Sequence, residues 1–200
     1  MPILGTVASQ FSGKPFPFLA FESIATGNGA GTATMVFSDI PQTFTHLQLR
    51  TVVRCNVSNY GFGGFTVKVG NGTADSGANY SYHRFFSSGD GSIGADGGSG
   101  FTSPYWTANN SLANNYAIGI IDILDYRNVN KYKTVRVLTG MDNNDSGATN
   151  YSNSPRAAME YSSGNWRSNS AINIITLTVG GIGTYIETNS KFALYGIKEE

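Results

Sequence analysis

The sequence predicts an all-β protein, an antiparallel β-sandwich of jelly-roll type that follows an extended N-terminal arm. Three observations lead to this prediction. From Phe21 onward, short runs rich in β-branched and aromatic residues alternate with turns rich in glycine and asparagine. No segment of a dozen residues shows the 3.6-residue period of an amphipathic helix. Roughly eight to ten such runs without an internal repeat favour two packed sheets over a propeller or a β-helix.

Length and charge narrow the classes of protein to which the chain can belong. Two hundred residues fit a single all-β domain, and 13 basic residues balance 13 acidic ones. Because no basic run is present, the electrostatic surface of a nucleic-acid-binding protein is missing. The chain has no apolar run long enough for a membrane span, and its N-terminus lacks the pattern of a secretory signal. We therefore expect synthesis in a reducing cytoplasm, no nucleic-acid partner and no membrane insertion.

Residues 1–20 are expected to form an extended arm. Pro15 and Pro17 remove backbone donors, and the segment has neither a helical nor a strand period. Its apolar side chains need a surface on which to lie. These candidate interface residues are Ile3, Leu4, Val7, Phe11, Phe16 and Phe18. The composition leaves open whether that surface belongs to the same domain or to a neighbouring subunit. Residues 21–200 are expected to form one domain.

The first half of this domain shows the two-residue period of strands with one buried face. The run 43–54 places four side chains on its inner face, and the run 65–69 places three there. The inner residues are Leu47, Leu49, Thr51, Val53, Phe65, Val67 and Val69. A shorter run of the same kind, 33–38, precedes them.

The second half mixes long apolar runs with polar loops. Residues 89–100 have too little apolar surface to pack, which predicts a mobile or partner-ordered loop. Residues 116–126 form a nearly continuous apolar run, typical of a strand buried on most of both faces. Residues 127–131 indicate a hairpin connection to the next run, 132–139. Residues 190–200 are apolar on both faces before three final charges, which predicts a closing strand inside a sheet.

Few residues suggest catalysis. His46 and His83 belong to no H-E-x-x-H motif, and the single Cys55 is best interpreted as a small buried hydrophobic residue. Asp122 and Asp125 lie on opposite faces of one run, so they cannot form the paired carboxylates of a glycosidase directly. We expect no enzyme activity and no cofactor.

A metal site is not expected either. Residues 142–147 partly match the opening of a calcium-binding loop, but the twelfth position is Asn153, where calcium loops of this type carry a glutamate, and no flanking helices are expected. An ordinary polar turn explains the segment better.

Aromatic residues in the loops are the remaining candidates for binding. Aromatic rings stack on sugars and also anchor protein interfaces, and composition does not separate these uses. Core packing is a third use of the same rings. The residues singled out as glycan or partner contacts are Tyr105, Trp106 and Trp166.

Several blocks of the chain together resemble virion structural proteins of tailed bacteriophages, a group that includes capsid-decoration and tail-associated β-sandwich proteins. The resemblance follows the chain in order, and the segments 89–100 and 141–155 match least. The blocks are M-P-I-L-G-T-V-A-S (1–9), F-E-S-I-A-T (21–26), F-S-D-I-P-Q-T-F-T-H-L-Q-L-R (37–50), D-I-L-D-Y (122–126), A-I-N-I-I-T-L (171–177) and S-K-F-A-L-Y-G-I-K (190–198). None of them carries a catalytic motif.

The resemblance implies a non-enzymatic protein on the virion surface, assembled in the host cytoplasm, with other virion proteins as partners. It also implies a homo-oligomer, since surface modules of this group are commonly trimers. The first expectation is a decoration or cement protein that docks on the capsid through its N-terminal arm. The alternative is a tail- or fibre-associated module that recognises host surface glycans.

Overall fold

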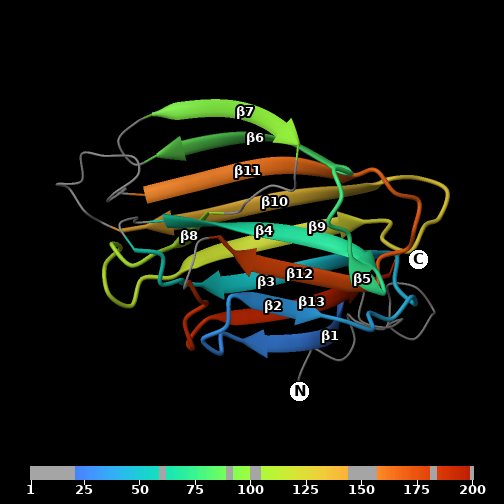
Figure 1. Ribbon diagram of the computed structural model, residues 1–200, viewed down its shortest axis with the longest axis horizontal. Helices are drawn as coiled ribbons and strands as arrows, with labels where there is room; N and C mark the ends of the chain where they lie inside the picture. Colours follow the sequence, from blue (N-terminus) through green and yellow to red (C-terminus); the bar gives the residue numbers. More distant parts are fainter. Residues whose placement is uncertain are drawn as a thin grey trace, which may run out of the picture.

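The computed structural model describes residues 21–58, 62–88, 92–99, 105–143, 157–180 and 184–198 (Figure 1). These residues contain thirteen strands and no helix, so the all-β prediction is confirmed. In chain order the strands are β1 (Phe21–Asn28), β2 (Thr34–Phe37), β3 (His46–Val53), β4 (Phe62–Asn71), β5 (Thr73–Ala74), β6 (Tyr80–Ser88), β7 (Ile93–Ser99), β8 (Tyr105–Thr107), β9 (Ala117–Leu124), β10 (Lys133–Asp142), β11 (Ala157–Trp166), β12 (Ile174–Val179) and β13 (Lys191–Ile197).

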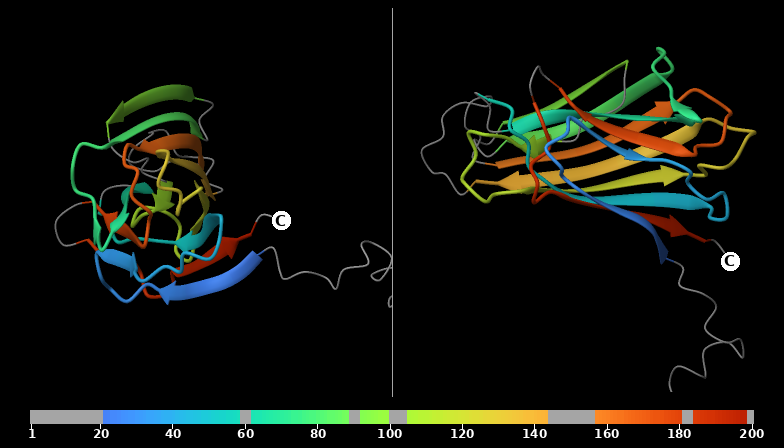
Figure 2. Two further views of the ribbon diagram at one scale, coloured as in Figure 1. Left: turned by 90° about the vertical axis from the view of Figure 1, so that its right-hand side faces the viewer. Right: turned by 60° about the horizontal axis from the view of Figure 1, so that its bottom comes forward.

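The strands form two antiparallel sheets that lie one over the other, as in a β-sandwich (Figure 2). The larger sheet has eight strands in the order β1-β13-β3-β9-β10-β11-β6-β7. The smaller has the order β2-β12-β4-β5, and β8 pairs with β4. The chain crosses between the layers repeatedly, because β1, β3, β9 and β13 belong to the larger sheet and β2, β4, β8 and β12 to the smaller. Jelly-roll topology remains a prediction.

The core lies between the two sheets, and the predicted inner faces are confirmed. Leu47, Leu49 and Val53 of β3 are buried, as are Phe65 and Val67 of β4. Each such side chain contributes about 1.5–3 kcal/mol relative to an exposed position. The two-residue period of the sequence therefore locates the core correctly in this half of the chain.

The closing strand is also confirmed. β13 lies inside the larger sheet between β1 and β3. Phe192 and Leu194 point into the core, and the ring of Phe44 lies against the backbone at Gly196. A Cβ atom at Gly196 would overlap with this ring. The last apolar residues of the chain thus occupy an interior position in the sheet.

A buried arginine holds the segment that leads into β9. The guanidinium of Arg54 donates from Nη1 to the carbonyls of Leu112 (2.8 Å) and Asn115 (3.1 Å) and from Nη2 to those of Asn109 (3.4 Å) and Ser111 (3.3 Å). These acceptors belong to one irregular segment without strand partners of its own. A single side chain from outside this segment therefore supplies hydrogen-bond donors to four of its carbonyls.

The expectation of a mobile loop at 89–100 is wrong for residues 93–99, which form strand β7. This strand pairs along its whole length with β6, so its backbone groups gain a ladder that compensates for the lack of apolar side chains. The ring of Phe86 on β6 lies over Gly94, where a side chain would overlap with it. Glycine in this strand thus marks a close approach of a neighbouring ring.

The expectation that residues 116–126 are buried on most of both faces is also wrong. β9 buries one face only: Ile121 and Ile123 are 1% exposed, whereas Ile118 is 64% and Ile120 is 39% exposed. The smaller sheet covers the inner face of the larger one, and no described residue covers the outer face at these positions. An apolar surface therefore remains on the outside of the molecule.

Candidate functional site

The candidate site is an apolar band on the outer face of the larger sheet. Eight outward-pointing apolar side chains are each between 39% and 69% exposed. They lie on six strands that are neighbours in the larger sheet, in the order β3, β9, β10, β11, β6, β7. They are Val52, Phe85, Ile93, Ile118, Ile120, Leu138, Met159 and Tyr161. We call this group the apolar band.

The strand register aligns the band in two adjacent rows. Residues that pair directly in an antiparallel sheet point to the same face, so the pairings give the neighbours on the outer surface. The first row runs Val52, Ile118, Gly140, Met159, Ser87, Ile93. The second runs Arg50, Ile120, Leu138, Tyr161, Phe85. The band is therefore a continuous feature made by five strand pairings.

A shallow depression of about 590 Å³ lies within the band. Ile118, Ile120, Leu138 and Met159 are among its lining residues. Gly140 lies in the first row between Ile118 and Met159 and has no side chain to fill the space. The surface of the band thus combines a hollow with protruding side chains.

Polar side chains border the band along the next row. Asp122 Oδ1 accepts a hydrogen bond of 2.8 Å from Gln48 Nε2, and its Oδ2 accepts one of 3.1 Å from Arg136 Nη2. Arg50 Nε donates to Gln48 Oε1 at 2.8 Å. An apolar centre with a hydrogen-bonded polar rim is the usual anatomy of a protein interface.

A second cluster lies on the inner face of the same sheet, at β10 and β11. Glu160 is fully buried and pairs across the strands with Thr139. Within the described part of the chain, the Thr139 hydroxyl and Trp106 Nε1 are buried without a hydrogen-bond partner, and the buried Ser162 hydroxyl lies beside the Glu160 carboxyl. Arg84 Nη1 lies 3.5 Å from Glu160 Oε2 as an ion pair.

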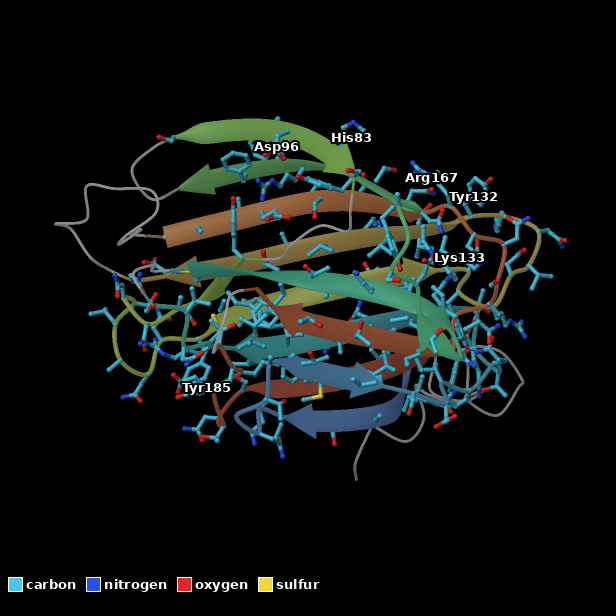
Figure 3. All side chains as sticks on the ribbon, viewed as in Figure 1. His83, Asp96, Tyr132, Lys133, Arg167 and Tyr185 are labelled. Carbon is cyan, nitrogen blue, oxygen red and sulfur yellow. The ribbon has the colours of Figure 1, made fainter. Side chains whose placement is uncertain are left out.

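Burial changes the acidity of this carboxyl. Removal from water raises the pKa of Glu160 from 4.5 to about 7, although the nearby Arg84 and Ser162 favour the charged form. Arg84 itself is shared, because its Nε and Nη2 also donate to Asp96 at 2.7 and 2.8 Å. Asp96 lies on β7 and is labelled in Figure 3. This arginine holds the pKa of Asp96 below its usual range. Glu160 therefore shares the guanidinium of Arg84 with Asp96.

The structure contradicts the expected contact role of Tyr105, Trp106 and Trp166. Their exposed fractions are 5%, 0% and 3%, so none presents a ring face for a sugar to stack on. Trp106 packs against Phe65 and Phe192 between the sheets.

Trp166 is held by polar contacts as well as by packing. Its Nε1 donates to Asp75 Oδ2 at 2.8 Å, and Lys133 Nζ lies 6.0 Å from the centre of its ring. The three rings fill space between strands, as large aromatic residues most often do. The arm residues Ile3, Leu4, Val7, Phe11, Phe16 and Phe18 lie outside the described residues.

Cys55 and His46, both considered above for catalysis or metal binding, are respectively buried and hydrogen-bonded to the backbone. Burial raises the pKa of the Cys55 thiol to about 11, so it is protonated and unreactive at neutral pH. His46 Nδ1 accepts a hydrogen bond of 2.9 Å from the backbone N–H of Asp125. The described ranges contain no group of three or more His, Cys, Asp or Glu residues that could hold a metal ion. Those ranges also include no helix able to cross a membrane.

Comparison with protein-family models, with curated proteins and with solved structures found no match to this chain. The resemblance to phage virion proteins therefore depends on the sequence blocks quoted above and stays a prediction.

Sequence reasoning missed the apolar band, although a signal was present. The run from Tyr116 to Tyr126 is apolar at positions of both parities, which indicates cover on both faces of the strand. The sequence does not show that this cover is missing within the chain. Met159 and Tyr161 flank Glu160 on β11, so there the period of two points apolar residues outward and the carboxyl inward.

Proposed function

We propose that the chain is a non-enzymatic structural protein of a phage virion, acting as a surface decoration or cement protein. The observation that supports this function best is the apolar band. A contiguous apolar patch of this kind often marks an interaction site, because burying it against another protein is favourable. On this proposal the band and the N-terminal arm are the two apolar surfaces through which the protein contacts itself and other virion proteins.

The alternative, a tail- or fibre-associated module that binds host glycans, has less support. It relied on Tyr105, Trp106 and Trp166, which are core residues in the structure. No other described observation favours a sugar over a protein as the partner. The decoration function is therefore the one we put forward.

Electron microscopy of the intact particle tests the proposal. Antibodies raised against the purified chain are expected to label the surface of the capsid, and the chain is expected among the proteins of purified particles. Finding it only in infected cells and never in particles would overturn the virion assignment. Labelling confined to the tail would support the alternative location.

A matched pair of variants tests the role of the band. Ile118→Lys places a charge in the band, while Val129→Lys makes the same kind of change at a residue that is 59% exposed in the turn between β9 and β10. We expect the first variant to be depleted from particles and the second to be incorporated normally. Equal incorporation of both would remove the band from the proposal.

A further inference from the structure

We propose that the apolar band is a self-association surface, covered in solution by the folded domain of a second copy of this chain. The inference deepens the proposed function and rests on it only in treating the band as an assembly surface. Four properties of the band point to a second copy: its area, its shape, its charge and the composition of β9.

The area is a substantial part of that of a stable protein interface. The eight side chains are about half exposed on average. Full burial of one apolar side chain removes roughly 60–120 Å² from water, so the band presents on the order of 250–500 Å². The largest apolar patch on a typical monomer has roughly 300–600 Å² and is often functional. Specific complexes bury about 800 Å² on each partner, so the band provides roughly half of the contribution of one subunit and its polar border can provide the rest.

The surface of the apolar band has both a hollow and protruding side chains, as two complementary surfaces need. The depression beside Gly140 is bordered by Ile118 and Met159, while Tyr161 and Phe85 stand in the next row about half exposed. A protruding side chain of one copy can enter the hollow of the other. Sheets that pack face to face interdigitate side chains in this way.

Charge does not oppose the association. The chain carries a formal net charge of zero, so two copies experience no overall repulsion as they approach. The border carries both signs, with Arg50 and Arg136 beside Asp122, and half of the Arg136 side chain is exposed. Two identical borders can therefore pair opposite charges at the edge of an apolar contact.

The composition of β9 supports the same conclusion. Ile118 and Ile120 face outward on a strand whose other face, with Ile121 and Ile123, lies in the core. A strand apolar on both faces is typical of one that is covered on both faces. The described part of the chain covers only one, so the second cover comes from outside it.

The oligomeric state of the full chain tests the inference. Sedimentation velocity over a series of concentrations is expected to show an oligomer for the natural chain and for Val129→Lys. Ile118→Lys and, as a second variant, Met159→Lys are expected to weaken association about 30-fold or more, as charges in the centre of an interface do. Far-UV circular dichroism checks that each variant keeps its strand content.

A footprint on the unmodified chain removes the dependence on variants. Met159 is 50% exposed in the isolated chain, so hydrogen peroxide will oxidise it when the band is free. We expect its oxidation to slow at concentrations at which the oligomer forms. Buried Met141 is the internal reference for the intact fold.

Three results would overturn the inference. The first is that the natural chain sediments as a monomer at every concentration. The second is that Met159 is oxidised equally fast in oligomer and monomer. The third is that the combined change Phe11→Ser and Phe16→Ser dissociates the oligomer as the band variants do. The segment that covers the apolar band would then be the N-terminal arm. None of these results decides whether the chain is found in particles, so the virion proposal fails or stands separately.

Discussion

Replacing Glu160 with glutamine tests whether a buried carboxyl makes the stability of this protein depend on pH. Glu160 is fully buried on β11, and Arg84 Nη1 lies 3.5 Å from its Oε2. Burial raises its pKa from 4.5 to about 7. The folded protein therefore binds the Glu160 proton more tightly than the unfolded chain does.

The sign of the pH dependence follows from this tighter binding. The proton on Glu160 stabilises the folded state relative to the unfolded chain. This contribution to the free energy of unfolding is fully present below the ordinary pKa of glutamate and is lost as the pH rises through about 7. Since a tenfold difference in proton affinity corresponds to about 1.4 kcal/mol, the full effect is about 3 kcal/mol. The glutamine side chain of the Glu160→Gln variant carries no charge at either extreme, so this part of the pH dependence should disappear.

Urea unfolding followed by circular dichroism measures the effect. At about pH 5 the natural chain and Glu160→Gln should unfold with similar free energies, and at about pH 8 the variant should be more stable by about 1–3 kcal/mol. Arg84 keeps Asp96 as a partner in the variant, so no buried charge is left unpaired. An unchanged pH slope in the variant would refute the reasoning.

A second variant controls for the change of charge alone. Glu22→Gln removes the same charge at a partly exposed site, where Lys198 Nζ lies 2.6 Å from Oε1. Surface ion pairs of this kind contribute about 0–1 kcal/mol, so its effect should be small at both pH values. An equal response of the two variants would mean that burial of Glu160 is not the cause.

Four substitutions test the packing of the fold by thermal or urea unfolding. Gly196→Ala places a Cβ atom in the ring of Phe44 and should cost about 1–3 kcal/mol, whereas Gly140→Ala, with no atom closer than 3.8 Å, should change stability by less than about 0.5 kcal/mol. Arg54→Met leaves four carbonyls of one segment without their donor and should cost at least about 2 kcal/mol; an unchanged midpoint would contradict that bonding. Trp166→Ala should lower the free energy of unfolding by about 3–5 kcal/mol because residue 166 is 3% exposed. An unchanged stability would mean that this ring is not buried.

The local period of the sequence was enough to predict the strands and their inner faces in several parts of the chain. Leu47 and Leu49 alternate with polar residues, whereas Phe192 and Leu194 belong to a closing run that is apolar on both faces. All four are buried. Such positions are predictable because neighbouring residues of a strand point to opposite faces whatever the strand pairs with. The all-β class and the closing strand follow from this property alone.

Other features depend on which distant strands become neighbours, and here only the tertiary structure decided. The pairing of β7 with β6 turned an expected loop into a strand, and the packing between the sheets buried Trp106 and Trp166. The apolar band exists because β3, β9, β10, β11, β6 and β7 lie side by side with their apolar outer residues in register. Burial is a property of the assembled layers, so a run of apolar residues can indicate that a face is covered, but not whether the cover lies within the chain.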